Sequence, residues 1–293
     1  MPLNNELMKP KVSIILPARN EGQNLHKLLP VLCEQFNSCE IIVVSDGSTD
    51  NTTEVCATFP ITVINHPYRM GNGAAIKTGA RAATGELLVF MDADGQHKPS
   101  DIPRLINTLL EGYDMVVGAR SNKGQANIGR LVANTVYNKL ASWMVSRKVD
   151  DLTSGFRVVR AEKFREFIHL LPNGFSYPTT STIAFFRAGY SVTYVPIETQ
   201  IRGGKSHIKI VRDGIRFLLI IFRIGTLYSP LKLFFPISLF HFLIGIGYYF
   251  YTFASSGRFT NMSALLLTMS IFVFLIGLIS EQITMLLYQK RGR

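Results

Sequence analysis

Two long apolar runs near the C-terminus constrain this chain more than any other feature of its sequence. Leu233 to Ala254 and Phe259 to Ser280 contain no Asp, Glu, Lys or Arg. Each is about 22 residues long, or ~33 Å as a helix, which matches a membrane hydrocarbon core of about 30 Å. A soluble helix that is hydrophobic on every side over this length needs a much larger protein around it. The runs therefore predict two transmembrane helices, about 233–254 and 262–284, within a hairpin over 229–293.

The basic residues around the two runs predict their orientation. The loop between the runs carries only Arg258, whereas the flanks carry Arg212, Arg216, Arg223, Lys232, Lys290, Arg291 and Arg293. The positive-inside rule then places both termini in the cytoplasm. The N-terminus lacks the basic, apolar and cleavage segments of a signal peptide, so we expect the preceding domain to be cytoplasmic as well. The sequence therefore predicts a multi-pass protein located in the cell membrane or in an endoplasmic-type membrane.

Residues 208–228 predict a helix that lies in the headgroup layer. One side at helical spacing carries Lys209, Arg212, Arg216 and Arg223, and the other carries Ile215, Leu218 and Phe222. A basic amphipathic helix of this kind binds at a membrane surface, although a solvated face of a domain helix is the alternative. The formal net charge of +11 suits an anionic membrane or a phosphorylated substrate. We expect those partners and no nucleic acid.

The first 207 residues predict a cytoplasmic α/β domain with a doubly wound, mostly parallel sheet. Strand-like runs alternate with helical spacing, and the nearly all-apolar run at Glu40–Ser45 is typical of a strand covered on both faces. The expected strands are 12–17, 40–45, 61–64, 86–91 and 115–118, and the expected helices are 21–35, 72–83, 100–111 and 128–145. Turn residues at 150–157 interrupt the pattern, and a second αβ portion runs from 161 to about 198.

Paired aspartates directly follow one of these strands. Asp92-Ala93-Asp94-Gly95-Gln96 comes after the apolar run 87–91. Ligands of open α/β sheets bind at the carboxyl ends of the strands, and two carboxylates separated by one small residue can hold Mg²⁺ or Mn²⁺. Such a metal would neutralise charge on the diphosphate of a leaving nucleotide. A bare triplet of this kind is often only a solvated loop, but its place after a strand favours a binding site.

Two further motifs end strands at the same expected edge. Asp46 follows the second strand and can accept hydrogen bonds from a nucleobase, although Asp46 to Asp50 is also compatible with a simple turn and helix cap. The segment Pro17-Ala18-Arg19-Asn20-Glu21 ends the first strand and places Glu21 near that edge. Together the motifs predict a nucleotide site over the strand ends.

Four segments in this order resemble the family 2 glycosyltransferases of GT-A fold: VSIILPARNEG, IIVVSDGSTD, GNGAA at 71–75, and MDADGQH. The later segment DLTSGFRV and the apolar tail make the chain similar to the dolichyl and polyprenyl phosphate sugar synthases within that family. The resemblance covers about residues 12–210. It implies an enzyme that transfers a hexose from a GDP- or UDP-linked sugar to a polyprenyl phosphate, with inversion and with a divalent metal.

The resemblance also implies roles for the matching positions. The nucleotide sugar would contact Pro17, Arg19, Glu21, Val44, Asp46, Asp92, Ala93, Arg202 and Lys205. The metal, Mg²⁺ or Mn²⁺, would be held by Asp92, Asp94 and Gln96. The lipid phosphate would contact Arg120, Arg130, Ser154 and Arg157, and the catalytic residues would be Asp94, Arg120 and Arg130. The chain departs from the family's usual sequence pattern at two positions. Arg19 stands where an aromatic residue is common, and Arg202 lies one position closer to the following glycine than the corresponding arginine of the mannose synthases.

An arginine-rich site suits a phosphate acceptor. A phosphate monoester is already anionic near neutral pH, with a second pKa of about 6, and therefore needs no strong base. The planar fork of arginine can grip it through two hydrogen bonds. The alternative is a family member with a hydroxyl acceptor, which would need a carboxylate base such as Asp150 or Asp151. A processive polysaccharide synthase would carry a QxxRW motif, which the single tryptophan, Trp143, does not match. A third alternative is an inactive domain that serves as a membrane scaffold.

Overall fold

The computed structural model describes residues 10–120, 128–174, 176–198, 222, 225–226 and 228–288, with backbone only for 128–134 and 288. The chain divides into two compact units, Met1–Lys205 and Ser206–Arg293. Arg202, Lys205 and most of the expected interfacial helix at 208–228 lie outside the described residues, as does the side chain of Arg130. The roles predicted for them, and the domain boundaries expected from the sequence, stay predictions.

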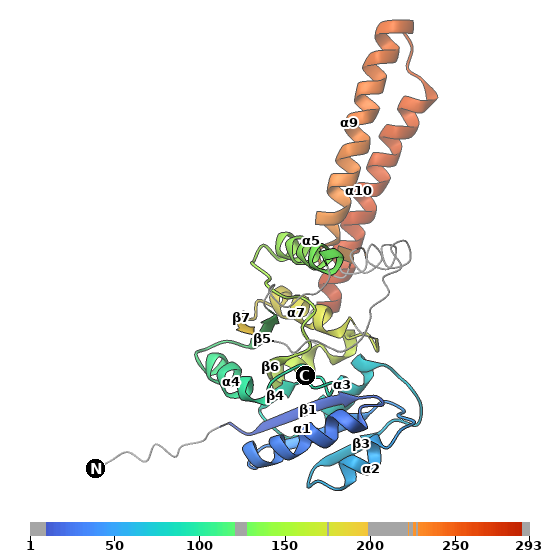
Figure 1. Cartoon of the computed structure of the whole chain (residues 1–293). Coiled ribbons are helices and arrows are strands. Elements are labelled where there is room, and N and C mark those ends of the chain that lie inside the picture. Colours follow the sequence, from blue (N-terminus) through green and yellow to red (C-terminus); the bar gives the residue numbers. More distant parts are fainter. Residues whose placement is uncertain are drawn as a thin grey trace, which may run out of the picture. The chain divides into compact units, whose positions relative to one another are not determined.

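The N-terminal unit is built on a seven-stranded sheet with the order β3-β2-β1-β4-β6-β5-β7 (Figure 1). The strands are β1 Val12–Ala18, β2 Glu40–Ser45, β3 Thr62–Asn65, β4 Leu87–Phe90, β5 Met115–Arg120, β6 Arg157–Arg160 and β7 Val192–Ile197. β6 runs antiparallel to both of its neighbours, and every other pair is parallel. The predicted mostly parallel sheet is confirmed. β6 went unpredicted because a four-residue strand with arginine at both ends carries no clear period.

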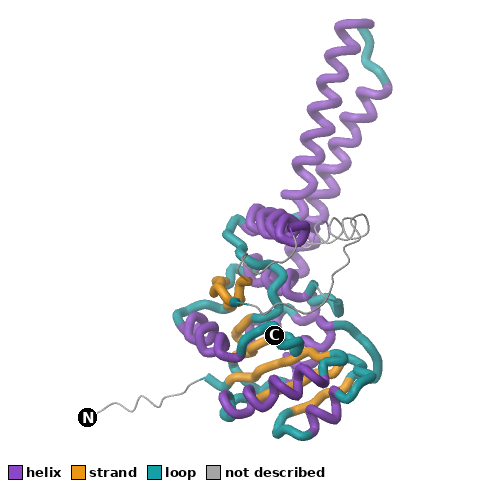
Figure 2. Tube along the Cα trace, in the orientation of Figure 1, coloured by secondary structure: helices purple, strands orange, loops and turns teal. Residues whose placement is uncertain are grey.

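Helices pack against this sheet, as Figure 2 shows in purple against the orange strands. The described helices of this unit are α1 Gly22–Gln35, α2 Thr52–Ala57, α3 Asn72–Ala82, α4 Ile102–Leu110, α5 Ile128–Val145, α6 Ala161–Glu166 and α7 Tyr177–Arg187, with 3-10 turns η1 Pro99–Asp101 and η3 Ile168–Leu170. Helical spacing explains their packing: Leu25, Leu29 and Leu32 of α1 are fully buried and join the core with Ile14 and Val43 of the sheet. The four helices expected from the sequence are confirmed.

The strand directions bring several motifs to one edge of the sheet. β1, β2 and β4 run parallel, and β5 runs in the same direction as β4 because both are antiparallel to β6. The residues that follow β1, β2, β4 and β5, and the residues that precede β6, therefore meet at the same edge. Asp46 N donates to Ala18 O at 2.8 Å, which ties the ends of β2 and β1 together there. This is the edge at which ligands of open α/β sheets bind.

Most of the described part of the C-terminal unit is a pair of helices, α9 Pro230–Ser256 and α10 Asn261–Tyr288. Both are long and apolar enough to cross a membrane, and only 11% and 17% of their most apolar windows are buried. A core helix of a soluble protein would be mostly buried, so the exposed apolar surface favours membrane spans. Glycine lets the two helices approach closely, since a Cβ at Gly277 would lie 2.8 Å from Cβ of Phe234. The two helices cover the spans predicted from the sequence at about 233–254 and 262–284.

Candidate active site

The paired aspartates lie immediately after β4, whose four residues are fully buried and so fix the start of the motif. The Asp92 side chain is 30% exposed and Asp94 is partly exposed, whereas Ala93 between them is buried. Asp94 Oδ1 accepts a hydrogen bond from Gln96 N at 3.1 Å across Gly95, whose φ of 73° favours glycine. This turn holds two carboxylates within reach of solvent at the edge of the sheet.

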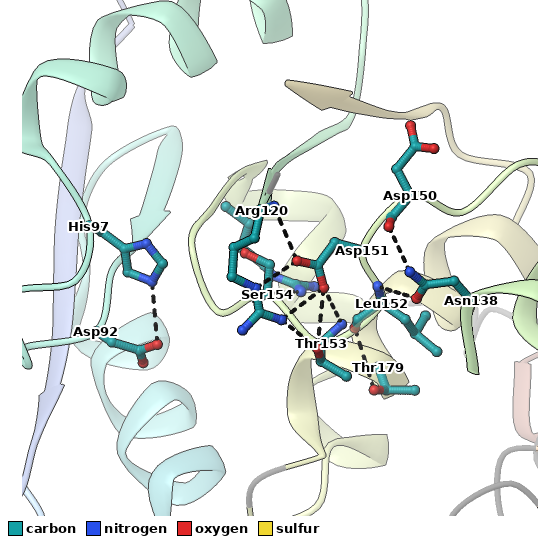
Figure 3. A network of polar contacts seen from close by, with 11 residues as sticks. Asp92, His97, Arg120, Asn138, Asp150, Asp151, Leu152, Thr153, Ser154 and Thr179 are labelled. Carbon is teal, nitrogen blue, oxygen red and sulfur yellow. Dashed lines mark hydrogen bonds and ion pairs between the residues drawn. The ribbon is translucent and has the colours of Figure 1, made fainter. Parts of the chain in front are cut away.

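Two residues beside Asp92 support its carboxylate. His97 Nε2 lies 3.6 Å from Asp92 Oδ2, and the buried His97 ring stacks on Phe156 with centroids 4.9 Å apart (Figure 3). Gly155 leaves space for the same carboxylate, because a Cβ at this position would lie 2.8 Å from Asp92 Oδ2. Sequence reasoning missed both residues. The signal for His97 was its place at the end of the MDADGQH segment.

The motif fits a divalent cation as a partial ligand set. The carboxylates of Asp92 and Asp94 and the amide of Gln96 offer the hard oxygen ligands that Mg²⁺ and Mn²⁺ prefer. Within the described residues, no three His, Cys, Asp or Glu side chains converge on one point. A cation here would therefore complete its coordination with water and substrate phosphate oxygens, as Mg²⁺ commonly does. The site is suited to a metal that arrives with a nucleotide.

Arg120 ends β5 and is held by Asp151. Its Nε donates to Asp151 Oδ2 at 2.7 Å, and its Nη2 donates to Asp151 Oδ1 at 3.0 Å and to Thr153 Oγ1 at 2.6 Å. Burial alone would lower the pKa of Arg120, but the hydrogen bonds and charge of Asp151, with the charge of Asp92, raise it. Nη1 has no partner among the described residues, and Figure 3 shows the free end of the guanidinium on the side of Asp92. Within the described part of the chain, one NH₂ group of Arg120 therefore has no protein partner.

Asp151 is buried, and its carboxylate is committed to Arg120. Burial alone would raise the pKa of Asp151, but the hydrogen bonds and charge of Arg120 outweigh it and hold that pKa below its ordinary value. A carboxylate in this state is a weak base at neutral pH. The loop around it is fixed by Asn138 of α5, whose Nδ2 donates to Asp150 O at 2.7 Å and whose Oδ1 accepts from Leu152 N at 3.1 Å. The neighbouring Asp150 side chain pairs with Lys148.

Arg157 lies at the start of β6 and is fully buried. Its guanidinium donates to Ser154 O, Pro178 O, Ser181 Oγ and Thr182 Oγ1, with no carboxylate partner among the described residues. Burial lowers the pKa of Arg157. Ser154 is also buried, and its hydroxyl has no hydrogen-bond partner within the described part of the chain. The structure thus gives Arg157 a supporting place below the edge, and acceptor contact by these two residues stays a prediction.

Asp46 is buried, and its carboxylate binds other parts of the protein. Its Oδ1 accepts from Met70 N at 2.7 Å and its Oδ2 from Gly71 N at 2.8 Å. His66 Nδ1 lies 3.0 Å from Oδ1, and Thr78 Oγ1 lies 2.9 Å from His66 Nε2. Asp46 therefore ties the end of β2 to the loop before α3. The nucleobase contact expected from the sequence stays a prediction.

The other residues expected near the nucleotide lie along β1 and β2. Pro17 and Val44 are buried partners in adjacent strands, so their side chains build the sheet beneath the edge. Arg19 is exposed, and Glu21 is partly exposed at the start of α1. Of this group, Arg19 and Glu21 have side chains that a ligand can reach.

Asp46→Asn should lower the free energy of unfolding by about 3 kcal/mol at neutral pH, because two backbone donors lose a charged acceptor. Burial alone would raise the pKa of Asp46, but the hydrogen bonds with His66, Met70 and Gly71 outweigh burial and hold that pKa below its ordinary value. The stabilisation is therefore complete above about pH 4 and is lost as the pH falls through the folded pKa. Chemical unfolding of the full chain in detergent micelles measures this. Glu54→Gln, at an exposed position of α2, is the matched control, and an equal loss in that variant would contradict the prediction.

The sequence matches the glycosyl transferase family 2 model over residues 13–168, which is more than half of the chain. The chain belongs to this family. Residues 229–286 match a second model, described as the GtrB C-terminal hairpin, which covers most of α9 and α10. The family 2 membership confirms the glycosyltransferase resemblance inferred from the sequence motifs.

Two relatives of this family 2 chain have names that include a lipid phosphate. Dolichol-phosphate mannosyltransferase of Pyrococcus furiosus is 35% identical over 217 residues, which is 68% of this chain and 59% of that protein. Undecaprenyl-phosphate 4-deoxy-4-formamido-L-arabinose transferase of Yersinia pestis is 32% identical over 197 residues, which is 60% of this chain and 59% of that protein. The chain thus spans 59% of the length of each of these relatives.

Solved structures support the fold of the family 2 domain. Glucosyl-3-phosphoglycerate synthase from Mycobacterium tuberculosis, crystallised with Mn²⁺ and UDP-glucose, has a TM-score of 0.58 and 22% sequence identity. The match covers 74% of this chain and 78% of that protein. At this identity the likeness shows the fold alone, and it confirms the predicted GT-A-like sheet.

Proposed function

We propose that this family 2 member transfers a hexose from a nucleotide sugar to a polyprenyl phosphate at the cytoplasmic face of a membrane. The observation that carries the proposal is the pairing of Arg120 with Asp151 near Asp92. It leaves a cation available to an anionic acceptor and leaves Asp151 unsuited to activate a hydroxyl. The relatives named for dolichol phosphate and undecaprenyl phosphate support the same acceptor class.

The donor would lie over the ends of β1, β2 and β4, with its diphosphate at Asp92 and Asp94. A divalent cation held by these carboxylates and Gln96, Mg²⁺ or Mn²⁺, would supply charge neutralisation to the leaving nucleotide. The chain itself fixes the carboxylates through the buried end of β4, the turn at Gly95 and the space left by Gly155. Both GDP- and UDP-linked sugars are compatible with this arrangement.

The acceptor phosphate would be oriented by Arg120, with Arg130 from the first turn of α5 as a second contact. A phosphate oxygen would form a bond to the anomeric carbon while the bond from that carbon to the diphosphate oxygen breaks. The nucleoside diphosphate leaves with the bonding electrons, and attack opposite to the leaving group inverts the anomeric centre. No proton has to be removed from the nucleophile, because a phosphate monoester is already anionic near neutral pH.

A hydroxyl acceptor is the second candidate, and the state of Asp151 weighs against it. Such an acceptor needs a carboxylate with an appreciable pKa to receive its proton. The charge and hydrogen bonds of Arg120 hold the pKa of Asp151 low, and Asp150 is exposed and paired with Lys148. An inactive scaffold is the third candidate, which the partly exposed carboxylates of Asp92 and Asp94 disfavour.

The membrane location rests on α9 and α10, and the orientation rests on the basic residues that flank them. The loop between the helices has Arg258 as its single basic residue, whereas several basic residues lie before α9 and after α10. By the positive-inside rule, the loop would be external and both termini cytoplasmic. The family 2 domain would then meet nucleotide sugars in the cytoplasm.

A donor panel tests the proposed reaction. The full chain in detergent micelles is incubated with polyprenyl phosphate and, separately, with GDP-mannose, UDP-glucose and UDP-N-acetylglucosamine. We expect one donor to give a lipid-linked sugar, EDTA to abolish the product, and Mg²⁺ or Mn²⁺ to restore it. Absence of product with every donor, together with absence of Mn²⁺-dependent binding of any nucleotide sugar, would instead favour a scaffold.

A further inference from the structure

Asp92 and Asp94, the two aspartates of the proposed cation site, are held in different ways. Asp94 is fixed within its own turn, where its Oδ1 accepts a hydrogen bond from Gln96 N at 3.1 Å. Within the described part of the chain, the only basic side chain that pairs with the Asp92 carboxylate is His97, whose Nε2 lies 3.6 Å from Oδ2 (Figure 3). The direction of the Asp92 carboxylate therefore depends on His97 and on the residues that pack around both side chains.

Packing fixes the ring of His97. Its side chain is 6% exposed, and the ring stacks on Phe156 with centroids 4.9 Å apart and an interplanar angle of 30°. Phe156 is fully buried, and Gly118 of β5 leaves room for it, because a Cβ at Gly118 would lie 3.1 Å from Phe156 Cδ1. A close-packed ring of this kind cannot turn freely, so Nε2 keeps its place beside Asp92.

The surroundings of the His97 ring assign its proton to Nε2. A neutral imidazole carries one N–H, and its other nitrogen is an acceptor. Nδ1 of His97 is buried without a hydrogen-bond partner among the described residues, whereas Nε2 faces the carboxylate of Asp92. A proton on Nδ1 would leave a buried donor unpaired and would set a lone pair against a negative charge, which costs free energy. The favourable arrangement directs Nε2–H at Asp92 Oδ2.

Gly155 supplies the space in which the Asp92 carboxylate lies. A Cβ at this position would be 2.8 Å from Asp92 Oδ2 and 3.2 Å from Oδ1. Gly155 is not among the glycines with positive φ, so the close carboxylate, and not the backbone, excludes a side chain here. Gly155 and Phe156 are neighbours in the segment DLTSGFRV. One dipeptide thus makes room for Asp92 and carries the ring of His97.

We propose that His97 is a positioning residue for the cation site and acts from a platform formed by Gly155 and Phe156. Nε2–H of His97 would hold Oδ2 of Asp92 and leave the other carboxylate oxygen to the divalent cation. At 3.6 Å the contact is longer than a hydrogen bond, and contacts of this kind often shorten when a site is loaded. The inference rests on the proposed function, because it takes Asp92 as a cation ligand.

Calorimetric titration of the full chain in detergent micelles tests this role without turnover. The probes are the Mn²⁺ complexes of GDP and UDP, and the same two nucleotides in EDTA. For a nucleotide that the wild type binds, His97→Phe should weaken binding of the Mn²⁺ complex by about 10- to 100-fold and leave metal-free binding unchanged. Phenylalanine keeps the stacking on Phe156 and removes the unpaired Nδ1, so the unfolding midpoint should not fall.

Two amide variants test whether Nε2 is the atom that matters. The side-chain nitrogen of glutamine can take the place of Nε2, whereas that of asparagine lies closer to the place of Nδ1. His97→Gln should therefore restore much of the affinity that His97→Phe loses, and His97→Asn should not. Equal affinity of the two amide variants would contradict a role for a donor at Nε2.

Gly155→Ala perturbs the same carboxylate independently of His97. The added methyl group meets the end of a flexible side chain, so the fold should hold while Asp92 moves and the Mn²⁺ complex binds more weakly. Gly174→Ala is the matched control, because a Cβ there meets nothing within 4 Å and its φ is not positive. This control should bind the Mn²⁺ complex as the wild type does.

The outcomes separate this inference from the proposed function. Wild-type affinity in both His97→Phe and Gly155→Ala would overturn the inference and leave the proposed function standing. A loss in His97→Phe that is equal with and without metal would do the same, because it would show a general disturbance of the nucleotide site. A wild type that binds neither nucleotide more tightly with Mn²⁺ than in EDTA would overturn the proposed cation site, and this inference with it.

Discussion

Asp94→Asn should lower the transfer of sugar from nucleotide sugar to polyprenyl phosphate by about a thousandfold or more. Asparagine keeps the size of the side chain but removes the negative charge on which a divalent cation depends, and loss of charge stabilisation at a leaving group is worth several kcal/mol. The measurement is the formation of radiolabelled lipid-linked sugar by membranes that contain equal amounts of wild type and variant. The donor is the one selected by the panel.

Asp101→Asn is the matched control for this substitution. Asp101 forms a partly exposed ion pair with Arg104, three residues further along the chain, and pairs near the surface contribute about 1 kcal/mol or less to stability. Transfer by the control variant should therefore stay close to that of the wild type. Turnover at the wild-type rate in Asp94→Asn would contradict a metal role for this aspartate.

Arg120→Met should lower the transfer about a hundredfold or more, because the acceptor phosphate loses a charged donor at the end of β5. The same change leaves Asp151 buried without its partner, which by itself destabilises a protein by about 3–5 kcal/mol. Loss of activity in the single variant therefore mixes two effects. Activity per folded molecule and the unfolding midpoint both have to be measured.

The double variant Arg120→Met with Asp151→Asn separates the two effects. It removes both members of the buried pair, so no uncompensated charge remains and much of the lost stability should return. Transfer should stay low, with an increased KM for polyprenyl phosphate and an unchanged KM for the donor. Recovery of transfer together with stability would show that Arg120 serves the fold and does not contact the acceptor.

The strands and helices that the sequence predicts best are those with strong periodic patterns. The nearly all-apolar run of β2 and the leucine spacing of α1 mark their positions because burial imposes these patterns locally. The same kind of pattern is enough to place Asp92 and Asp94 at a strand end. No such pattern predicts β6, because only two apolar residues lie between Arg157 and Arg160.

The partners of the site residues could not be predicted in this way. The backbone donors that occupy Asp46 come from Met70 and Gly71, more than twenty residues further along the chain. Asp151 and Arg120 are likewise distant in sequence, and no local pattern links them. Arg157 is buried although arginine is mostly exposed in proteins, because backbone and hydroxyl oxygens accept its hydrogen bonds. Long-range packing, which a single sequence does not encode visibly, decides these contacts.

The proposed acceptor is a lipid phosphate, and a comparison of two acceptors distinguishes it from a lipid alcohol. The purified full chain is given its preferred donor with either a polyprenyl phosphate or the polyprenol of the same chain length. The pairing of Arg120 with Asp151 predicts lipid-linked sugar from the phosphate alone. Product from the polyprenol at a comparable rate would contradict this claim, because it would require a free base that the site keeps bound to arginine.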